Sequence, residues 1–142
     1  MINSVKDVRI INLPTDFSEN GDLTVMEGSK HVPFSIARVF VVRATEGSIR
    51  GLHAHKFCTQ FLTCPYGIVE VICDDSDVTT TFKLDNPGVG LLIPPGIWAH
   101  QRYVRNNSVL TVLCDRIYEA NDYIREYLVF KEYRGIKSIK SS

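Results

Sequence analysis

The chain has 142 residues, of which 16 are Lys or Arg and 16 are Asp or Glu, so its formal net charge is zero. This length predicts one domain spanning residues 1–142. Balanced charge argues against binding to nucleic acid or to an anionic membrane, because affinity for phosphate depends on clustered positive charge. No run approaches the roughly 18 apolar residues that cross a bilayer, and the N-terminus lacks the apolar core of a signal peptide. We therefore expect a cytoplasmic protein.

The predicted elements, in chain order, are almost all β-strands, because apolar residues recur at every second position. The segments with this pattern are 34–43, 68–73, 79–84, 91–93, 98–104 and 109–113. Turn-forming segments separate them, such as Pro94-Pro95-Gly96. At the end of the chain, 122–127 is expected to complete the sheet and 129–139 to form a short helix. The pattern predicts an all-β sandwich or barrel with a short C-terminal helix.

Four cysteines lie inside these apolar runs and none forms a CxxC pair: Cys58, Cys64, Cys73 and Cys114. This spacing favours neither a zinc site nor a thioredoxin-like pair. We expect four small buried hydrophobic residues in a reducing compartment.

The most specific spacing in the chain is Gly47-x5-His53-Ala54-His55-x4-Gln60-x6-Gly67. It matches the first cupin motif, G-x5-HxH-x3,4-E-x6-G, with Gln60 in place of Glu. Residues two apart in a strand share a face, so His53 and His55 point the same way, which in a small barrel is the interior. Gln60 lies five residues beyond His55 and would face away from the histidines unless a bulge intervenes. Gln60 either reaches the pocket by such a bulge or is a polar side chain that is satisfied in a turn or on the solvent face.

The second cupin motif is present without its histidine, as Gly88-x5-Pro94-Pro95-Gly96-Ile97-Trp98-Ala99. His100 comes one residue late and should face the opposite side of the sheet. A metal-binding cupin uses a carboxylate from the first motif and a histidine from the second, and this chain lacks both. The sequence therefore predicts a protein without a metal or other cofactor.

Several segments resemble the dTDP-4-keto-6-deoxyglucose 3,4-ketoisomerases, which are RmlC-like cupins. The resemblance rests on 50–56, Gln60, 84–91, 93–98 and 122–127 and spans about residues 8–130. It implies a cupin (double-stranded β-helix, jelly-roll) fold and a metal-independent isomerase that converts a nucleotide-linked 4-keto-6-deoxyhexose into its 3-keto isomer. It also implies a homodimer, a dTDP-linked sugar as substrate and a role in deoxyaminosugar synthesis for surface glycans such as lipopolysaccharide.

The chemistry of this reaction assigns roles to the histidines. A 4-keto sugar has an acidified proton at C3, and removing it gives an enediolate shared by C3 and C4. That step needs a base with a pKa near neutrality and a second proton carrier. We expect His53 to be the base and His55 to support proton delivery.

Five other residues are candidates for binding the substrate, and Gln60 is one of them. Arg50 and Arg125 suit the diphosphate, because guanidinium groups bind its oxygens, although Arg50 could instead hold its loop and Arg125 could form a surface ion pair. Trp98 and Tyr123 could stack on the thymine or the sugar ring, or simply belong to the core.

Three other functions stay open from the sequence alone. A cupin that binds a nucleotide sugar without turning it over would show no change in the ketone. A 3,5-epimerase of the same architecture would exchange the protons at C3 and C5 and leave the ketone at C4. A metal-dependent cupin dioxygenase or isomerase would carry a stoichiometric metal.

Overall fold

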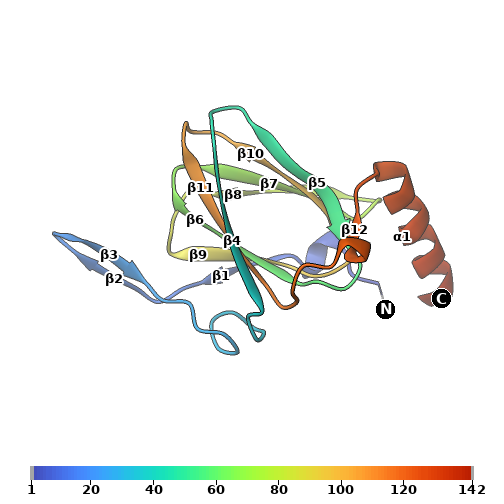
Figure 1. The fold of residues 1–142 in the computed structure, drawn as a ribbon, viewed down its shortest axis with the longest axis horizontal. Helices are drawn as coiled ribbons and strands as arrows, with labels where there is room; N and C mark the ends of the chain where they lie inside the picture. The colour runs from blue at the N-terminus through green and yellow to red at the C-terminus, as the bar shows by residue number, and fades with distance from the viewer. Residues whose placement is uncertain (1, 142) are drawn as a thin grey trace.

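Two five-stranded antiparallel sheets packed face to face make up most of the chain, in a computed structural model that describes residues 2–141 and the side chains of residues 2–136 (Figure 1). The first sheet has the order β1 (Arg9–Asn12), β9 (Val89–Ile93), β6 (Gln60–Tyr66), β11 (Ser108–Cys114), β4 (Arg38–Ala44). The second has the order β12 (Tyr123–Ile124), β5 (Ile49–His55), β10 (Trp98–Tyr103), β7 (Val69–Asp74), β8 (Thr79–Leu84). The expectation of an all-β sandwich is confirmed.

The remaining elements lie around this sandwich. A hairpin of β2 (Thr15–Ser18) and β3 (Gly21–Thr24) stands away from one end of it (Figure 1). Two short 3-10 helices, η1 (Val5–Asp7) and η2 (Ala120–Asp122), precede strands, and helix α1 (Tyr127–Ser141) packs beside β5 and β12. The predicted C-terminal helix is thus confirmed. Within the described residues no helix is long and apolar enough to span a bilayer.

Two parts of the fold differ from the sequence-based expectation. The strand predicted from residue 34 begins only at Arg38, because Phe34 and Ile36 pack with Leu13 and Val32 in a separate small core instead of joining a sheet. The β2–β3 hairpin was not predicted, because most of its residues are exposed and therefore show no apolar alternation.

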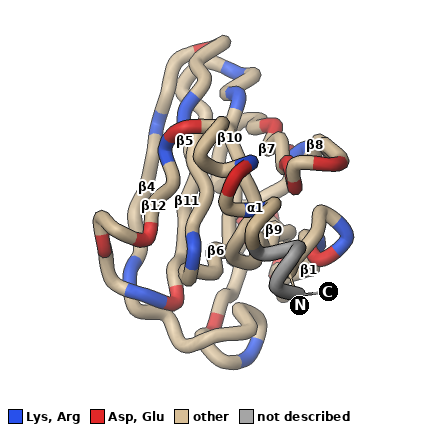
Figure 2. The backbone as a smooth tube through the Cα atoms, turned by 90° about the vertical axis from the view of Figure 1, so that its right-hand side faces the viewer, with Lys and Arg blue, Asp and Glu red and all other residues tan. Residues whose placement is uncertain are grey.

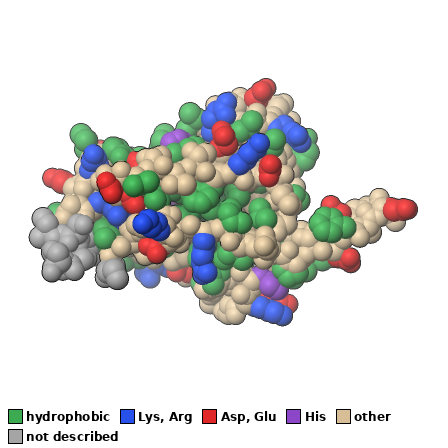
Figure 3. Space-filling view, turned by 180° about the vertical axis from the view of Figure 1, so that it is seen from behind, with side chains coloured by type: hydrophobic (Ala, Val, Ile, Leu, Met, Phe, Trp, Pro, Cys, Tyr) green, Lys and Arg blue, Asp and Glu red, His purple; other side chains and the backbone are tan. Residues whose placement is uncertain are grey.

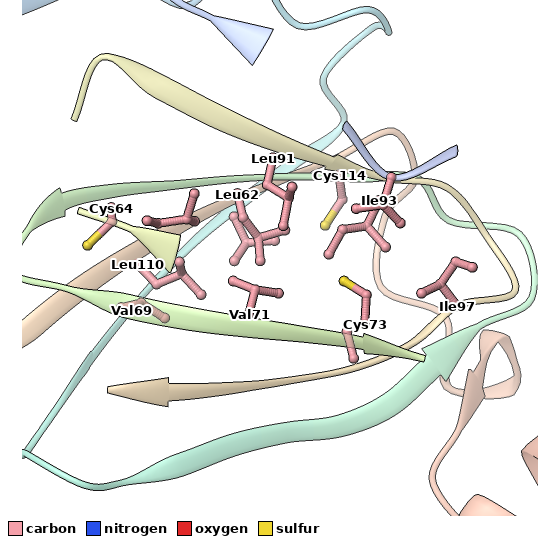
Figure 4. Close-up of a cluster of buried hydrophobic side chains, with 14 of the residues drawn as sticks. Leu62, Cys64, Val69, Val71, Cys73, Leu91, Ile93, Ile97, Leu110 and Cys114 are labelled. Carbon is pink, nitrogen blue, oxygen red and sulfur yellow. The ribbon is translucent and has the colours of Figure 1, made fainter. Parts of the chain in front are cut away.

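The main core lies between the two sheets (Figure 4). Side chains such as Leu62 and Leu110 from the first sheet meet Val69 and Val71 from the second. All four cysteines are buried and none forms a disulfide, as the sequence predicts. Along the backbone, positions with Lys or Arg are interspersed with positions that carry Asp or Glu (Figure 2).

Candidate active site

A bulge in β5 aims the first histidine into the barrel. Gly51 and Leu52 have left-handed φ angles of 91° and 59°, and His53 pairs with Ala99 while Gly51 pairs with His100, so Leu52 is an extra residue in the strand. A leucine in this conformation stores strain, which is typical of functional sites. Gly51 is required for a second reason, since a Cβ there would lie 2.7 Å from Gln101 Oε1.

The sandwich encloses a cavity of about 230 Å³ between its sheets. Four of the residues expected at the site line it: Arg50, His53, Gln60 and Arg125. Apolar side chains from β4, β6 and β11 form the opposite wall, namely Phe40, Val42, Leu62, Leu110 and Val112. His55 adjoins a smaller space that it shares with His53, Gln60 and Ala99. The structure therefore gathers the histidines around one interior, as the motif predicts.

Gln60 reaches the histidines from the opposite sheet. β5 ends at His55 and β6 begins at Gln60, so the two residues belong to different sheets and no bulge between them is needed. The Gln60 amide donates to Cys114 Sγ at 3.7 Å and is nearly buried. Ala99 and Gln101 line the space around the histidines, whereas His100 between them does not, in agreement with its predicted orientation.

A buried carboxylate fixes the second histidine. Asp122 Oδ2 lies 2.7 Å from His55 Nδ1, and Asp122 Oδ1 accepts the backbone N–H of Phe57 at 2.6 Å. An ionised carboxylate only accepts hydrogen bonds, so Nδ1 carries the proton and His55 Nε2 has a free lone pair. That Nε2 is buried and has no hydrogen-bond partner among the described residues, and the same is true of His53 Nδ1.

Sequence reasoning missed Asp122 as part of the site. It lies 67 residues beyond His55, in the 3-10 turn η2 that leads into β12. β12 pairs Tyr123 with His55 and Ile124 with Ala54, which brings the carboxylate alongside the imidazole. A lone Asp in a turn carries no sequence signal for such a contact.

Tyr123 packs directly on the two histidines. Its ring centroid lies 5.0 Å from that of His53 and 4.4 Å from that of His55. Arg38 donates to the Tyr123 hydroxyl at 3.1 Å, and the Arg125 guanidinium lies 4.3 Å from the Tyr123 ring centroid. Tyr123 thus links the histidine pair to two cations, and Arg38 joins the residues at the site.

Trp98, expected at the site, lines neither the cavity nor the smaller space beside the histidines. It is 7% exposed and belongs to a small core with Ala54, Ile124 and Phe130. Its ring lies 5.6 Å from that of Phe130 in helix α1. Trp98 therefore anchors the helix, which explains its identity without a ligand.

Both histidines are held in the neutral form. Burial, with a smaller contribution from His55, lowers the pKa of His53 from 6.5 to about 4. Burial also lowers the pKa of His55, against the opposing effect of Asp122. At neutral pH both imidazoles are therefore unprotonated and able to accept a proton.

This electrostatic arrangement predicts the acid limb of the pH profile. If His53 must be neutral, kcat/KM should stay constant through neutrality and fall only as the pH approaches about 4, not near 6.5. The free energy of unfolding should also decrease at low pH, because His53 binds a proton more weakly in the folded protein than in the unfolded chain. The stability that the neutral His53 contributes is fully present above about pH 6.5, and about 3 kcal/mol of it is lost as the pH falls to about 4. Circular dichroism at each pH separates unfolding from protonation, and a limb near 6.5 in folded protein would contradict the prediction.

One group of side chains has the composition of a metal site. One ligand atom each from His55, Cys58 and Asp122 lies within 4.8 Å of the others. Both Asp122 oxygens, however, already accept hydrogen bonds, one from His55 Nδ1 and one from the Phe57 backbone N–H. A metal ion bound through Asp122 would compete with these two hydrogen bonds.

Comparison with known proteins identifies the family. The model of the family described as "FdtA: WxcM-like, C-terminal" matches residues 6–135. The chain belongs to this family. The chain is 38% identical to the TDP-4-oxo-6-deoxy-alpha-D-glucose-3,4-oxoisomerase of Aneurinibacillus thermoaerophilus. The match extends over 126 residues and covers 88% of this chain and 91% of the relative. The resemblance drawn from the sequence is therefore confirmed.

Solved structures of the same kind share the fold. QdtA, a sugar 3,4-ketoisomerase from Thermoanaerobacterium thermosaccharolyticum crystallised with TDP, is 30% identical with a TM-score of 0.90, covering 94% of this chain and 98% of that one. The WlaRB TDP-quinovose 3,4-ketoisomerase from Campylobacter jejuni is 33% identical with a TM-score of 0.83, covering 89% and 98%. The jelly-roll architecture is thereby confirmed.

Proposed function

We propose that this chain is an isomerase that converts a TDP-linked 4-keto-6-deoxyhexose, TDP-4-keto-6-deoxyglucose, into its 3-keto isomer. The observation that carries the proposal is relatedness at 38% identity, over most of both chains, to an oxoisomerase of that substrate. The cavity supplies what the chemistry needs, since two neutral imidazoles each present a nitrogen without a protein partner.

The reaction divides between the two histidines. His53 removes the proton from C3, and the electron pair of that C–H bond forms the C3–C4 double bond of an enediolate while the C4 carbonyl becomes an oxyanion. His55 Nε2 takes the proton from the C3 hydroxyl and gives it to O4, and Asp122 stabilises the transient imidazolium. The C3 carbonyl forms as the protonated His53 returns its proton to C4. Negative charge on the enediolate favours protonated His53 in the transition state, which offsets its low pKa.

Arg50 and Arg125 are proposed to hold the diphosphate. Both line the cavity and are exposed to solvent, and neither forms an ion pair within the described residues. A guanidinium at the cavity edge offers a fixed set of donors to phosphate oxygens.

An Arg125→Ala variant should raise KM or lower turnover without moving the pH optimum, because a guanidinium stays protonated throughout and serves no base role. Steady-state kinetics at several pH values measure this. Arg102→Ala, which removes an exposed partner of Glu70, is the matched control. Unchanged kinetics for both Arg50→Ala and Arg125→Ala would place these residues outside the site.

We also propose that catalysis is independent of metal. Gln60 is neutral and Ala99 has no donor atom, so the carboxylate and the second-motif histidine of a cupin metal site are both missing. Asp122, the carboxylate nearest to the histidines, is held in hydrogen bonds to His55 and Phe57. Activity should therefore survive EDTA, and elemental analysis should find no stoichiometric transition metal. Loss of activity on chelation, restored by iron, manganese or zinc, would overturn this mechanism.

The proposed reaction is tested by NMR of TDP-4-keto-6-deoxyglucose incubated with the protein. The carbonyl carbon should change from C4 to C3. A 3,5-epimerase would exchange deuterium at C3 and C5 and keep the C4 ketone, and a binding protein would leave the sugar unchanged. Relatives at 30% identity or more are ketoisomerases, which does not favour either alternative.

The wider setting of the enzyme is also proposed. We expect one domain, a homodimer and a cytoplasmic location, in a route to deoxyaminosugars of surface glycans. Support for the dimer comes from β4, an edge strand whose outward side chains Val39 and Val41 are exposed, and from exposed Phe17 and Leu23 on the projecting hairpin (Figure 3). Exposed apolar side chains on an unpaired edge are typical of a surface covered by a second copy.

A further inference from the structure

Tyr103 places a hydroxyl group inside the barrel with nothing in the protein to bind it. The residue is 0% exposed and lies on β10, and its side chain lines the 230 Å³ cavity. Its hydroxyl has no hydrogen-bond partner among the described residues. Leaving a buried hydroxyl unsatisfied costs folding free energy, and a phenylalanine would fill the same space without that cost.

The position of Tyr103 along β10 shows which part of a substrate it meets. Ala99, Gln101 and Tyr103 alternate along the inward face of the strand, and Ala99 pairs with His53. Tyr103 therefore lies two inward-facing positions beyond Ala99 along β10. It lines the same cavity as Val42 and Leu110 of the apolar wall. Four residues of extended strand span about 13 Å, so we place the Tyr103 hydroxyl against a part of the sugar other than the carbons beside His53.

The size of the cavity limits what reaches this hydroxyl. A volume of about 230 Å³ is below the range of about 300–1,000 Å³ that encloses drug-sized ligands. A cavity of this size suits the sugar, and the exposed Arg50 and Arg125 at its edge suit the diphosphate.

We propose that the Tyr103 hydroxyl hydrogen-bonds an oxygen of the sugar ring portion of the substrate, remote from C3 and C4, and so fixes the sugar with C3 beside His53. This inference rests on the proposed function and extends it to a residue of substrate recognition. Tyr103 binds and orients the sugar and takes no part in proton transfer, since burial raises its pKa to about 12.

Tyr103→Phe tests the inference, because it removes only the hydroxyl. We expect kcat/KM for TDP-4-keto-6-deoxyglucose to fall by about 5- to 30-fold, while the affinity for TDP and the pH profile stay unchanged. The melting temperature of the free protein should stay the same or rise, since an unsatisfied polar group is lost. Thr63→Val is the matched control: the Thr63 hydroxyl is equally buried and unpartnered but lines a different cavity, beside Asp22 and Met26. Its kinetics should match wild type.

Each other outcome overturns the inference. Unchanged kcat/KM would show that the hydroxyl does not touch the substrate, and an equal loss of TDP affinity would place the contact at the nucleotide. A lower melting temperature with unchanged substrate affinity would make the hydroxyl structural. If the variant is insoluble, ¹³Cζ-tyrosine NMR decides: a tyrosine signal other than that of Tyr123, which is identified by its loss in Tyr123→Phe, must shift with the sugar nucleotide and not with TDP. Wild-type turnover tests the proposed function separately.

Discussion

A His53→Asn variant should lose about 10²- to 10⁴-fold in turnover, the usual contribution of a general acid–base group. Asparagine has a similar size and keeps a polar group at the bulge, but it has no lone pair basic enough to remove the C3 proton. The decisive measurement is deuterium incorporation at C3 in heavy water, which reports the base step alone. It should slow as much as turnover does.

The control for this variant is His100→Asn. His100 is half-buried on the same pair of strands but lies outside the spaces that the two histidines line. Its activity should equal that of wild type. If His53→Asn exchanged the C3 proton at the wild-type rate, the base would lie elsewhere, and His55, whose Nε2 is also unpartnered, would be the first candidate. His55→Asn should be damaging in either case, because proton transfer between O3 and O4 depends on it.

The second large effect is expected for Asp122→Asn, with a loss of turnover of about 10²- to 10⁴-fold. The asparagine oxygen still accepts from the Phe57 N–H, but its amide nitrogen then donates to His55 Nδ1. This inverts the tautomer, so that His55 Nε2 carries a proton and can no longer accept one from the sugar. The backbone contact is preserved, so the change is mainly one of proton position.

Nitrogen-15 NMR of the histidines measures this inversion directly. The wild-type His55 should show a protonated Nδ1, and the variant a protonated Nε2. Glu119→Gln, in the same segment but paired on the surface with Arg116, is the control and should keep both tautomer and turnover. Full activity of Asp122→Asn would mean that the fixed tautomer of His55 plays no part in catalysis.

The features of the site that follow from local periodicity were predictable. His53 and His55 share a face because strands repeat every two residues, and His100 is excluded for the same reason. The expectation that the chain binds no metal rests on Gln60 and Ala99 in the same motifs, and it stays a prediction for the elemental analysis. Tyr123 was expected at the site as a ring that stacks on the substrate, and in the structure it packs on His53 and His55.

The features that depend on long-range packing were not predictable. Asp122 reaches His55 through a strand of two residues, which carries no detectable pattern. Trp98 was expected to contact substrate because a tryptophan on a strand gives no indication of which side a later helix will cover. The bulge at Leu52 also leaves no trace, since leucine is rarely found in a left-handed conformation.

The short strand β12 has a consequence for how the enzyme gains and loses activity. The segment from Asp122 to Arg125 supplies the carboxylate, the aromatic ring and one guanidinium of the site, and its strand pairing with β5 is limited to two residue pairs, besides the hydrogen bonds of Asp122 to His55 and Phe57. We expect this segment to open at a lower free energy than the sandwich behind it. On heating, catalysis should therefore fail reversibly while the sheets remain folded. During synthesis β5 is complete well before this segment is made, so the protein acquires its chemistry as one of the last events of folding.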